Sequence, residues 1–154
     1  MHRFIIALSC FLMTFAAPIS AQDFEKGVAA YNSGDYATAF KEWKPLADAG
    51  GQSSQLNIGV MYNNGLGVPQ DYKEAVKWYT LAAEQGYDRA QFSLGNMYNN
   101  GLGIPQDYKE AVKWYTLAAE QGNVTARLNL GLMYDNGYGI PQDYKEAVKW
   151  YTLA

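Results

Sequence analysis

Apolar residues recur at helical spacing through most of the chain, in short amphipathic stretches separated by glycine-containing turns. One stretch carries its apolar residues at Ala90, Leu94, Met97 and Tyr98. The next stretch carries them on one helical face, at Tyr108, Ala111, Val112, Tyr115, Ala118 and Ala119. Charged residues fall outside this face, so the pattern predicts two amphipathic helices joined by a loop.

Turn and capping residues set the ends of both predicted helices. Gly101 follows the first helix, and a glycine there can adopt the left-handed conformation that ends a helix. Asp107 is the expected N-cap of the second helix, with Glu110 as its capping-box partner three residues later. Gly122 ends that helix, and the next helical pattern begins after it.

Gly95 lies inside the first predicted helix, where glycine costs about 1 kcal/mol relative to alanine. Glycine recurs at the equivalent positions Gly59 and Gly131. We therefore expect a neighbouring helix to approach closely at this position and to pack there through its alanines.

The helix pair is repeated along the chain. The 14-residue string Pro-Gln-Asp-Tyr-Lys-Glu-Ala-Val-Lys-Trp-Tyr-Thr-Leu-Ala begins at Pro69, Pro105 and Pro141, which gives a period of 36 residues. Segments 51–86 and 87–122 are identical at 27 of 36 positions. A repeat of this length is typical of helical solenoids.

The sequence therefore predicts an all-α fold, an α/α superhelical solenoid of about four helix-turn-helix pairs. Residues 22–50 follow the repeat plan more loosely and are expected to cap the N-terminal end of the stack. The predicted repeats are residues 51–86, 87–122 and 123–154, the last of them truncated in its second helix. A tryptophan beside the apolar face of each second helix is expected to pack against the following repeat; these are Trp78, Trp114 and Trp150.

Residues 1–21 have the pattern of a secretory signal peptide. A cationic start precedes an apolar run over residues 4–17, and small residues lead to an expected cleavage after Ala21. An N-terminal membrane anchor is the alternative, but the run is shorter than the roughly 20 residues that span a bilayer. The run also continues past Cys10, which argues against a lipidated cysteine. We expect the rest of the chain to be exported, to a bacterial periplasm, without membrane insertion.

The composition restricts the chemistry that the exported chain can perform. The full chain has 12 Lys and Arg residues against 15 Asp and Glu, a net charge of −3, and loss of Arg3 with the signal peptide makes it −4, which argues against nucleic acid as a partner. The only histidine and the only cysteine are His2 and Cys10, both inside the predicted signal peptide. The remaining chain lacks a Ser-His-Asp or Cys-His nucleophile, a His or thiolate zinc site, and disulfides. We predict no catalytic residue, metal or cofactor.

Two strings carry a resemblance to a known family: Ala90-x3-Leu94-Gly95-x2-Tyr98-x2-Gly101-x-Gly103 and Asp107-x3-Ala111-x2-Trp114-x3-Ala118-Ala119-x2-Gly122. They resemble the Sel1-like repeat, a relative of the tetratricopeptide repeat, over residues 51–154, whereas residues 23–50 are similar to a generic tetratricopeptide unit. The resemblance implies a superhelix that binds proteins or peptides without chemistry of its own, and bacterial members are often secreted. Cysteine-rich members described as penicillin-binding or β-lactamase-like carry paired cysteines in each repeat. The chain after residue 21 has none, so that activity is not carried over.

Differences between the repeat copies indicate where a partner binds. They gather in the first helices, which line the concave surface in the tetratricopeptide stacks that this family resembles. Polar side chains there suit hydrogen bonding to an extended peptide. The predicted partner-binding residues are Gln55, Asn57, Val60, Gln91, Ser93, Asn96, Arg127, Asn129 and Leu132. Neutral drift after duplication is the alternative explanation of the differences.

The sequence thus predicts an interaction scaffold of the bacterial envelope that binds a protein or peptide on its concave face. The alternative is a cell-envelope enzyme or binding module that acts on peptidoglycan or β-lactams. Such an enzyme would take its nucleophile from Ser33, Ser53, Ser54 or Ser93, none of which begins a Ser-x-x-Lys motif. The sequence stops inside the last predicted helix, and we expect either that the chain is a fragment of a longer array or that the exposed apolar end docks on a partner or on another copy of the chain.

Overall fold

The computed structural model describes residues 21–154, so the predicted signal peptide, residues 1–21, lies outside the described part apart from Ala21. The described residues form eight α-helices and no strand. Their bounds are α1 Ala21–Asn32, α2 Tyr36–Asp48, α3 Gln52–Asn64, α4 Tyr72–Glu84, α5 Asp88–Asn100, α6 Tyr108–Glu120, α7 Val124–Asn136 and α8 Tyr144–Leu153.

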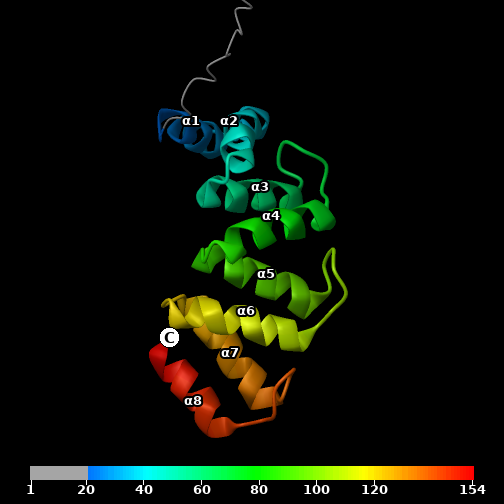
Figure 1. Ribbon diagram of the computed structural model, residues 1–154, viewed down its shortest axis with the longest axis vertical. Coiled ribbons are helices and arrows are strands. Elements are labelled where there is room, and N and C mark those ends of the chain that lie inside the picture. The colour runs from blue at the N-terminus through cyan, green and yellow to red at the C-terminus, as the bar shows by residue number, and fades with distance from the viewer. Residues whose placement is uncertain (1–20) are drawn as a thin grey trace, which may run out of the picture.

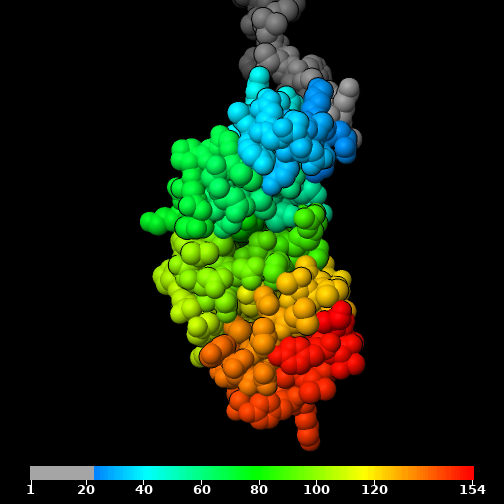
Figure 2. Space-filling model, turned by 180° about the vertical axis from the view of Figure 1, so that it is seen from behind, coloured from blue at the N-terminus to red at the C-terminus, as the bar shows by residue number. Residues whose placement is uncertain are grey.

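The helices form one elongated stack of hairpins. Helices that follow one another in the sequence make most of the contacts, and the chain zigzags along the long axis of the molecule (Figure 1). Successive hairpins follow one another along the long axis and are in contact (Figure 2). This arrangement confirms the predicted all-α solenoid of helix pairs. Within residues 21–154, no helix has the length and apolarity needed to cross a bilayer.

The second helices α4, α6 and α8 begin with the same capping arrangement. At the start of α6, Oδ1 of Asp107 accepts hydrogen bonds from the backbone N–H groups of Lys109 and Glu110, at 2.9 and 3.1 Å. The reciprocal half of the predicted capping box does not form. The backbone N–H of Asp107 donates instead to the carbonyl of Tyr98, and the Glu110 carboxylate accepts from Nζ of Lys113. The capping residue therefore ties the start of α6 to the end of α5.

Two glycines shape the loop between the helices of each long repeat. Gly101 ends α5 in the predicted left-handed conformation, with φ 67°, and its backbone N–H donates to the carbonyl of Met97. Gly103 also has a positive φ, 70°, and it packs directly on the backbone of Tyr72, at the start of α4 in the preceding repeat. A Cβ atom at residue 103 would overlap the Tyr72 carbonyl group, so this glycine sets how closely two repeats approach each other.

The apolar cores lie between successive repeats. In the middle of the stack, α4 contributes Ala75 and Tyr79, and α5 contributes Leu94 and Met97. The half-buried Trp114 of α6 packs against this same core. The core at each junction thus combines the second helix of one repeat with both helices of the next, which makes neighbouring repeats depend on each other for stability.

The repeated tryptophans pack against the preceding repeat, so the expectation that they contact the following one is wrong. Trp78 of α4 belongs to the core that α2 and α3 form, and Nζ of Lys44 in α2 lies 5.1 Å from the centre of its ring. Trp150 of α8 packs in the same way on the core of α6 and α7. The reason is the direction of stacking, which places the indole of a second helix beside the second helix of the repeat before it, as the contact between Lys44 and Trp78 shows.

The expected close approach at the helical glycines is confirmed, but a tyrosine ring and not alanine makes the contact. A Cβ atom at Gly95 would lie 2.7 Å from both Cδ1 and Cε1 of Tyr115, in the second helix of the same hairpin. The equivalent pairs are Gly59 with Tyr79 and Gly131 with Tyr151. Each ring lies directly against the backbone of the first helix, so the residue beneath it can have no side chain.

Candidate functional site

Two adjoining hollows run along the first helices of the repeats. One, of about 580 Å³, lies between α1, α3 and α5, and the other, of about 310 Å³, lies between α3, α5 and α7. Leu56, Val60 and Arg89 line both hollows, so the two form one surface, which we call the first-helix groove. Its other apolar and aromatic residues are Phe24, Val28, Tyr31, Trp43, Tyr87 and Phe92. Its other polar residues are Asn32, Ser53, Asn57, Ser93, Asn123 and Thr125.

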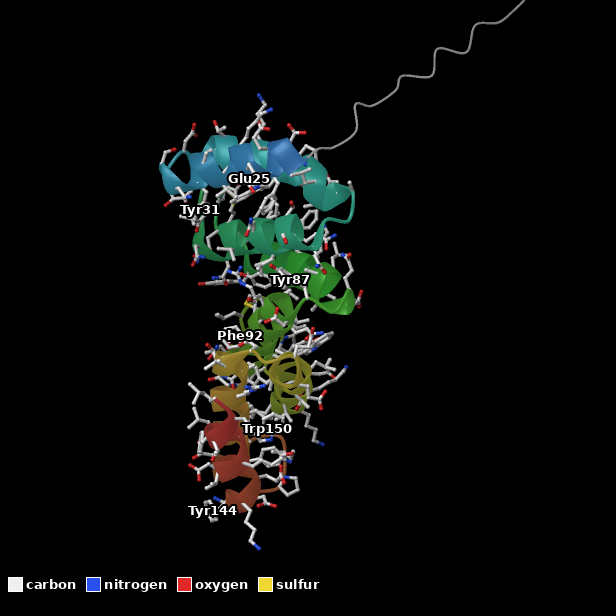
Figure 3. All side chains as sticks on the ribbon, turned by 90° about the vertical axis from the view of Figure 1, so that its left-hand side faces the viewer. Glu25, Tyr31, Tyr87, Phe92, Tyr144 and Trp150 are labelled. Carbon is white, nitrogen blue, oxygen red and sulfur yellow. The ribbon has the colours of Figure 1, made fainter. Side chains whose placement is uncertain are left out.

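The groove combines aromatic rings with a single charged side chain. Tyr31, Tyr87 and Phe92 lie at successive levels along the stack (Figure 3). Arg89 is the only charged residue in the lining of the two hollows. The groove can therefore offer apolar contacts, neutral hydrogen-bonding groups and a single guanidinium to a bound segment.

A third hollow, of about 230 Å³, adjoins α5, α6 and α7. The hydroxyl of Tyr115 donates to Oδ1 of Asn96 at 2.7 Å, and Nδ2 of Asn129 approaches the same oxygen at 3.4 Å. These contacts hold the amide of Asn96 at the edge of the hollow, where a main-chain group of a partner can reach it.

The structure places six of the nine predicted partner-binding residues on these hollows. Asn57, Val60 and Ser93 line the first-helix groove, and the third hollow is lined by Asn96, Asn129 and Leu132. The remaining three, Gln55, Gln91 and Arg127, line none of the three hollows.

Those three residues bond to the preceding repeat. Gln91 is buried, and its Nε2 donates to the carbonyl of Ala83 while its Oε1 accepts from Nε2 of Gln121 at 2.7 Å. Gln55 is buried in the same arrangement, and Nε of Arg127 donates to the carbonyl of Ala119 at 3.0 Å. The last turn of a helix leaves carbonyl groups without partners inside the helix, and these side chains supply donors to them. This corrects the expectation that Gln55 and Gln91 contact a partner.

The aromatic residues of the groove and Arg89 were not among the residues predicted to bind a partner. Comparison of the copies at further positions would have found part of them, because Ser53, Arg89 and Thr125 share one position and all three line the groove. Tyr87 shares its position with Gly51 and Asn123, which also differ. The residues of α1 gave no such indication, because residues 22–50 are not a close copy of the later repeats.

Three of the four candidate nucleophiles of the enzymatic alternative form hydrogen bonds to the main chain or are buried, whereas Ser53 is half-buried in the lining of the first-helix groove. The hydroxyl of Ser93 donates to the carbonyl of Arg89, and that of Ser33 donates to the carbonyl of Ala30, both at 2.9 Å. Ser54 is buried. In the described residues, no group of His, Cys, Asp and Glu side chains is arranged to hold a metal ion.

Large apolar side chains are exposed on the last repeat. Val148 and Tyr144 of α8 are each 62% exposed. The other exposed apolar residues of this repeat are Val124, Leu128, Leu132, Tyr138 and Leu153. End-to-end association through this surface stays a prediction.

Two buried tyrosines have perturbed ionisation. Burial raises the pKa of Tyr115 to about 12, and hydrogen bonding with Asn129 opposes part of that shift. Burial also raises the pKa of Tyr79 far above its ordinary value. Both rings lie over helical glycines, so the neutral phenol is a requirement of the hairpin packing.

We expect the protein to lose stability in strongly alkaline solution because of these tyrosines. The fold favours the neutral phenol, so its contribution is complete below the unfolded pKa of about 10 and is lost as the pH rises through the folded pKa. The free energy of unfolding should fall by up to about 1.4 kcal/mol per pH unit for each tyrosine. Urea unfolding followed by circular dichroism across this range measures the slope. Tyr115→Phe should reduce it; a slope equal to that of the unmodified protein would contradict the assignment.

Comparison with known proteins finds matches that coincide with the three repeats. The family model of the Sel1 repeat matches residues 52–87, 88–123 and 124–154. The crystal structure of c5321, a protective antigen present in uropathogenic Escherichia coli strains that displays an SLR fold, is similar with a TM-score of 0.82 and 39% identity. That match covers 85% of this chain and 29% of c5321. No curated protein matches the sequence.

Two further solved structures are similar. A Sel1 repeat protein from Oxalobacter formigenes has a TM-score of 0.81 and 38% identity, over 85% of this chain and 54% of that protein. The present chain thus spans less than two thirds of the length of this protein and of c5321. Cysteine-rich protein B of Helicobacter pylori has a TM-score of 0.55 and 22% identity, over 82% of this chain and 84% of that one, which shows a shared fold.

Proposed function

Since the chain belongs to the Sel1 repeat family, we propose that it is a scaffold that holds an extended segment of a partner protein in the first-helix groove. Sel1 repeat proteins generally mediate protein–protein interactions. The groove lies on the first helices, where the concave binding surface was expected. The partner-binding residues proposed here are Asn57, Val60, Ser93, Asn96, Asn129 and Leu132, together with the aromatic residues of the groove and Arg89.

The position of the differences between repeats carries this proposal. Residues 69–82 and 105–118 are identical, and they form the second helices and the approach to them. By contrast, the pairs of equivalent residues that line the groove differ: Ser53 and Arg89, Leu56 and Phe92, Asn57 and Ser93. A frame of uniform second helices with varied groove residues is what recognition of one particular segment requires.

The proposed mechanism of binding is steric and polar. The amide of Asn57 and the hydroxyl of Ser93 supply donors and acceptors for the backbone of an extended segment. Tyr87 and Phe92 supply apolar surface for its side chains. Because the stacked repeats are ordered before the partner arrives, little conformational entropy is lost from the scaffold on binding.

We propose that the scaffold acts in the bacterial periplasm without catalysis. The signal-peptide pattern of residues 1–21 supports export. The hydrogen bonds of Ser33 and Ser93 to main-chain carbonyls support a non-catalytic role, because neither hydroxyl is directed at a general base. The alternative is an envelope enzyme or binding module for peptidoglycan or β-lactams. Covalent labelling of the purified protein by a fluorescent penicillin would support that alternative.

Site-specific photocrosslinking tests the proposed groove. A photoreactive phenylalanine analogue at Asn57 or Ser93 should give a covalent adduct with one partner protein in the native compartment. The same analogue at the exposed Lys109, on second helix α6, is the matched control and should give none. Mass spectrometry then identifies the crosslinked segment.

The crosslinking outcomes distinguish the alternatives. Adducts of equal yield at groove and control positions would contradict the groove proposal. An adduct between two copies of the chain would assign the surface to self-association, which the exposed apolar residues of α8 also favour.

A further inference from the structure

Arg89 occupies a special place in the first-helix groove. It lines both hollows, so it lies where the larger one meets the smaller one. It is exposed, and it contributes the only charge in the lining of either hollow. The equivalent residues of the neighbouring repeats are Ser53 and Thr125, so this positive charge appears once along the groove.

The guanidinium of Arg89 has no counter-ion within the described residues. The ion pairs there join a lysine to an acid three or four residues away on the same helix. The adjacent acid, Asp88, accepts a hydrogen bond from Nδ2 of Asn123 at the start of α7. Arg89 therefore has no ion-pair partner among the described residues, so its guanidinium is available to whatever occupies the groove.

We propose that the groove selects a segment with an acidic side chain, Asp or Glu, whose carboxylate pairs with Arg89. This inference rests on the proposed function and adds the chemical class of the segment. A planar guanidinium can bind a carboxylate through two parallel hydrogen bonds. Tyr87 and Phe92 lie close by in the lining and provide sites for apolar or aromatic residues that flank the acid. The recognised segment thus carries an acidic residue flanked by apolar ones.

The geometry favours an acidic side chain over a terminal carboxylate. The groove continues on both sides of Arg89, towards α1 in one direction and towards α7 in the other. A chain that ended at Arg89 would leave one of the two hollows empty. A side chain from the middle of an extended segment lets the backbone run through both.

Selection from a display library of random linear dodecapeptides tests the inference on the exported chain, residues 22–154. Peptides enriched by the unmodified protein should be rich in Asp and Glu beside apolar residues. Peptides enriched by Arg89→Glu should lose that acidic preference and gain Lys and Arg. A preference that is the same for both proteins would overturn the inference.

The affinity of the best-enriched peptide gives the second measurement, by fluorescence anisotropy. Arg89→Gln should weaken binding about tenfold. Arg89→Lys should recover only part of the loss, because an ammonium lacks the planar pair of donors that forms two parallel hydrogen bonds to a carboxylate. Lys109→Gln removes one positive charge outside the groove and should leave the affinity unchanged. Added salt should weaken binding to the unmodified protein more than binding to Arg89→Gln.

A groove-filling variant separates this inference from the proposed function. Ser93→Trp places a large ring in the smaller hollow and should abolish binding of the selected peptides. If Ser93→Trp abolishes peptide binding but Arg89→Gln leaves the affinity unchanged, the acidic selectivity is overturned and the groove proposal stands. Peptides insensitive to both changes, or no enrichment at all, would overturn both proposals. Unchanged circular dichroism of each variant excludes unfolding as the cause.

Discussion

Replacing Gly103 by alanine is expected to lower the free energy of unfolding by about 3 kcal/mol. Two penalties add at this position. An alanine at a φ of 70° is in the left-handed region, which costs about 1–2 kcal/mol, and its Cβ would overlap the carbonyl group of Tyr72. That carbonyl is backbone at the start of α4, so it can move only if two repeats move apart. Urea unfolding of the purified variant gives the loss directly.

Gly86 provides the matched control for this prediction. Its φ is 87°, but nothing lies within 4 Å of the position where a Cβ would be built. Gly86→Ala should therefore show the conformational penalty alone, about 1 kcal/mol. Equal losses in the two variants would mean that the contact between Gly103 and Tyr72 does not limit the approach of the repeats.

The spacing between repeats matters for binding because the first-helix groove spans several of them. Its larger hollow takes residues from α1, α3 and α5, which belong to three successive hairpins. A change at Gly103 that separates two hairpins would therefore also shift Tyr87 and Arg89 relative to Leu56 and Val60. The nearly identical loops and the identical second helices thus hold the varied groove residues at fixed distances from one another.

Local features of the fold were predictable from the sequence because they depend on residues close together in the chain. The N-cap role of Asp107 and the left-handed Gly101 follow from side chains within a few residues of a helix end. The buried face of α6, with Ala111, Tyr115 and Ala118, follows from helical periodicity alone. These features needed no knowledge of how one hairpin packs on the next.

Features set by the neighbouring repeat were not predictable in the same way. Trp114 contacts the preceding repeat and not the following one, which depends on the direction in which hairpins stack. Gln91 varies among the copies as a surface residue would, yet it is buried because the carbonyl of Ala83 lies opposite it. Arg89 was missed because its importance comes from the two hollows that meet there, and a groove between hairpins leaves little trace in the periodicity of one helix.

Gly95→Ala is expected to destabilise the protein by about 2 kcal/mol, although the same change at an open helical position stabilises by about 1 kcal/mol. The new Cβ would lie 2.7 Å from Cδ1 and Cε1 of Tyr115, a ring that is only 1% exposed. The ring can move away only by giving up its packing and the hydrogen bond that its hydroxyl makes to Asn96 at the third hollow. Helix propensity alone therefore predicts that Gly95→Ala raises the free energy of unfolding, whereas packing against Tyr115 predicts that it lowers it. The sign of the measured change distinguishes the two.

A double-mutant cycle at the equivalent pair in the last repeat tests the same contact where the ring is less buried. A Cβ at Gly131 would lie 2.7 Å from Cδ1 of Tyr151, which is only partly buried, so Tyr151→Ala should leave the protein folded. Gly131→Ala should destabilise the unmodified protein and stabilise the Tyr151→Ala variant, where only the propensity gain remains. If Gly131→Ala has the same effect in both backgrounds, the tyrosine ring is not the reason that each first helix carries a glycine. If the sign reverses as expected, one packing rule explains Gly59, Gly95 and Gly131. In each of these hairpins a tyrosine ring of the second helix packs on the bare backbone of the first helix. This contact joins the two helices and keeps the first helix in place beneath the groove.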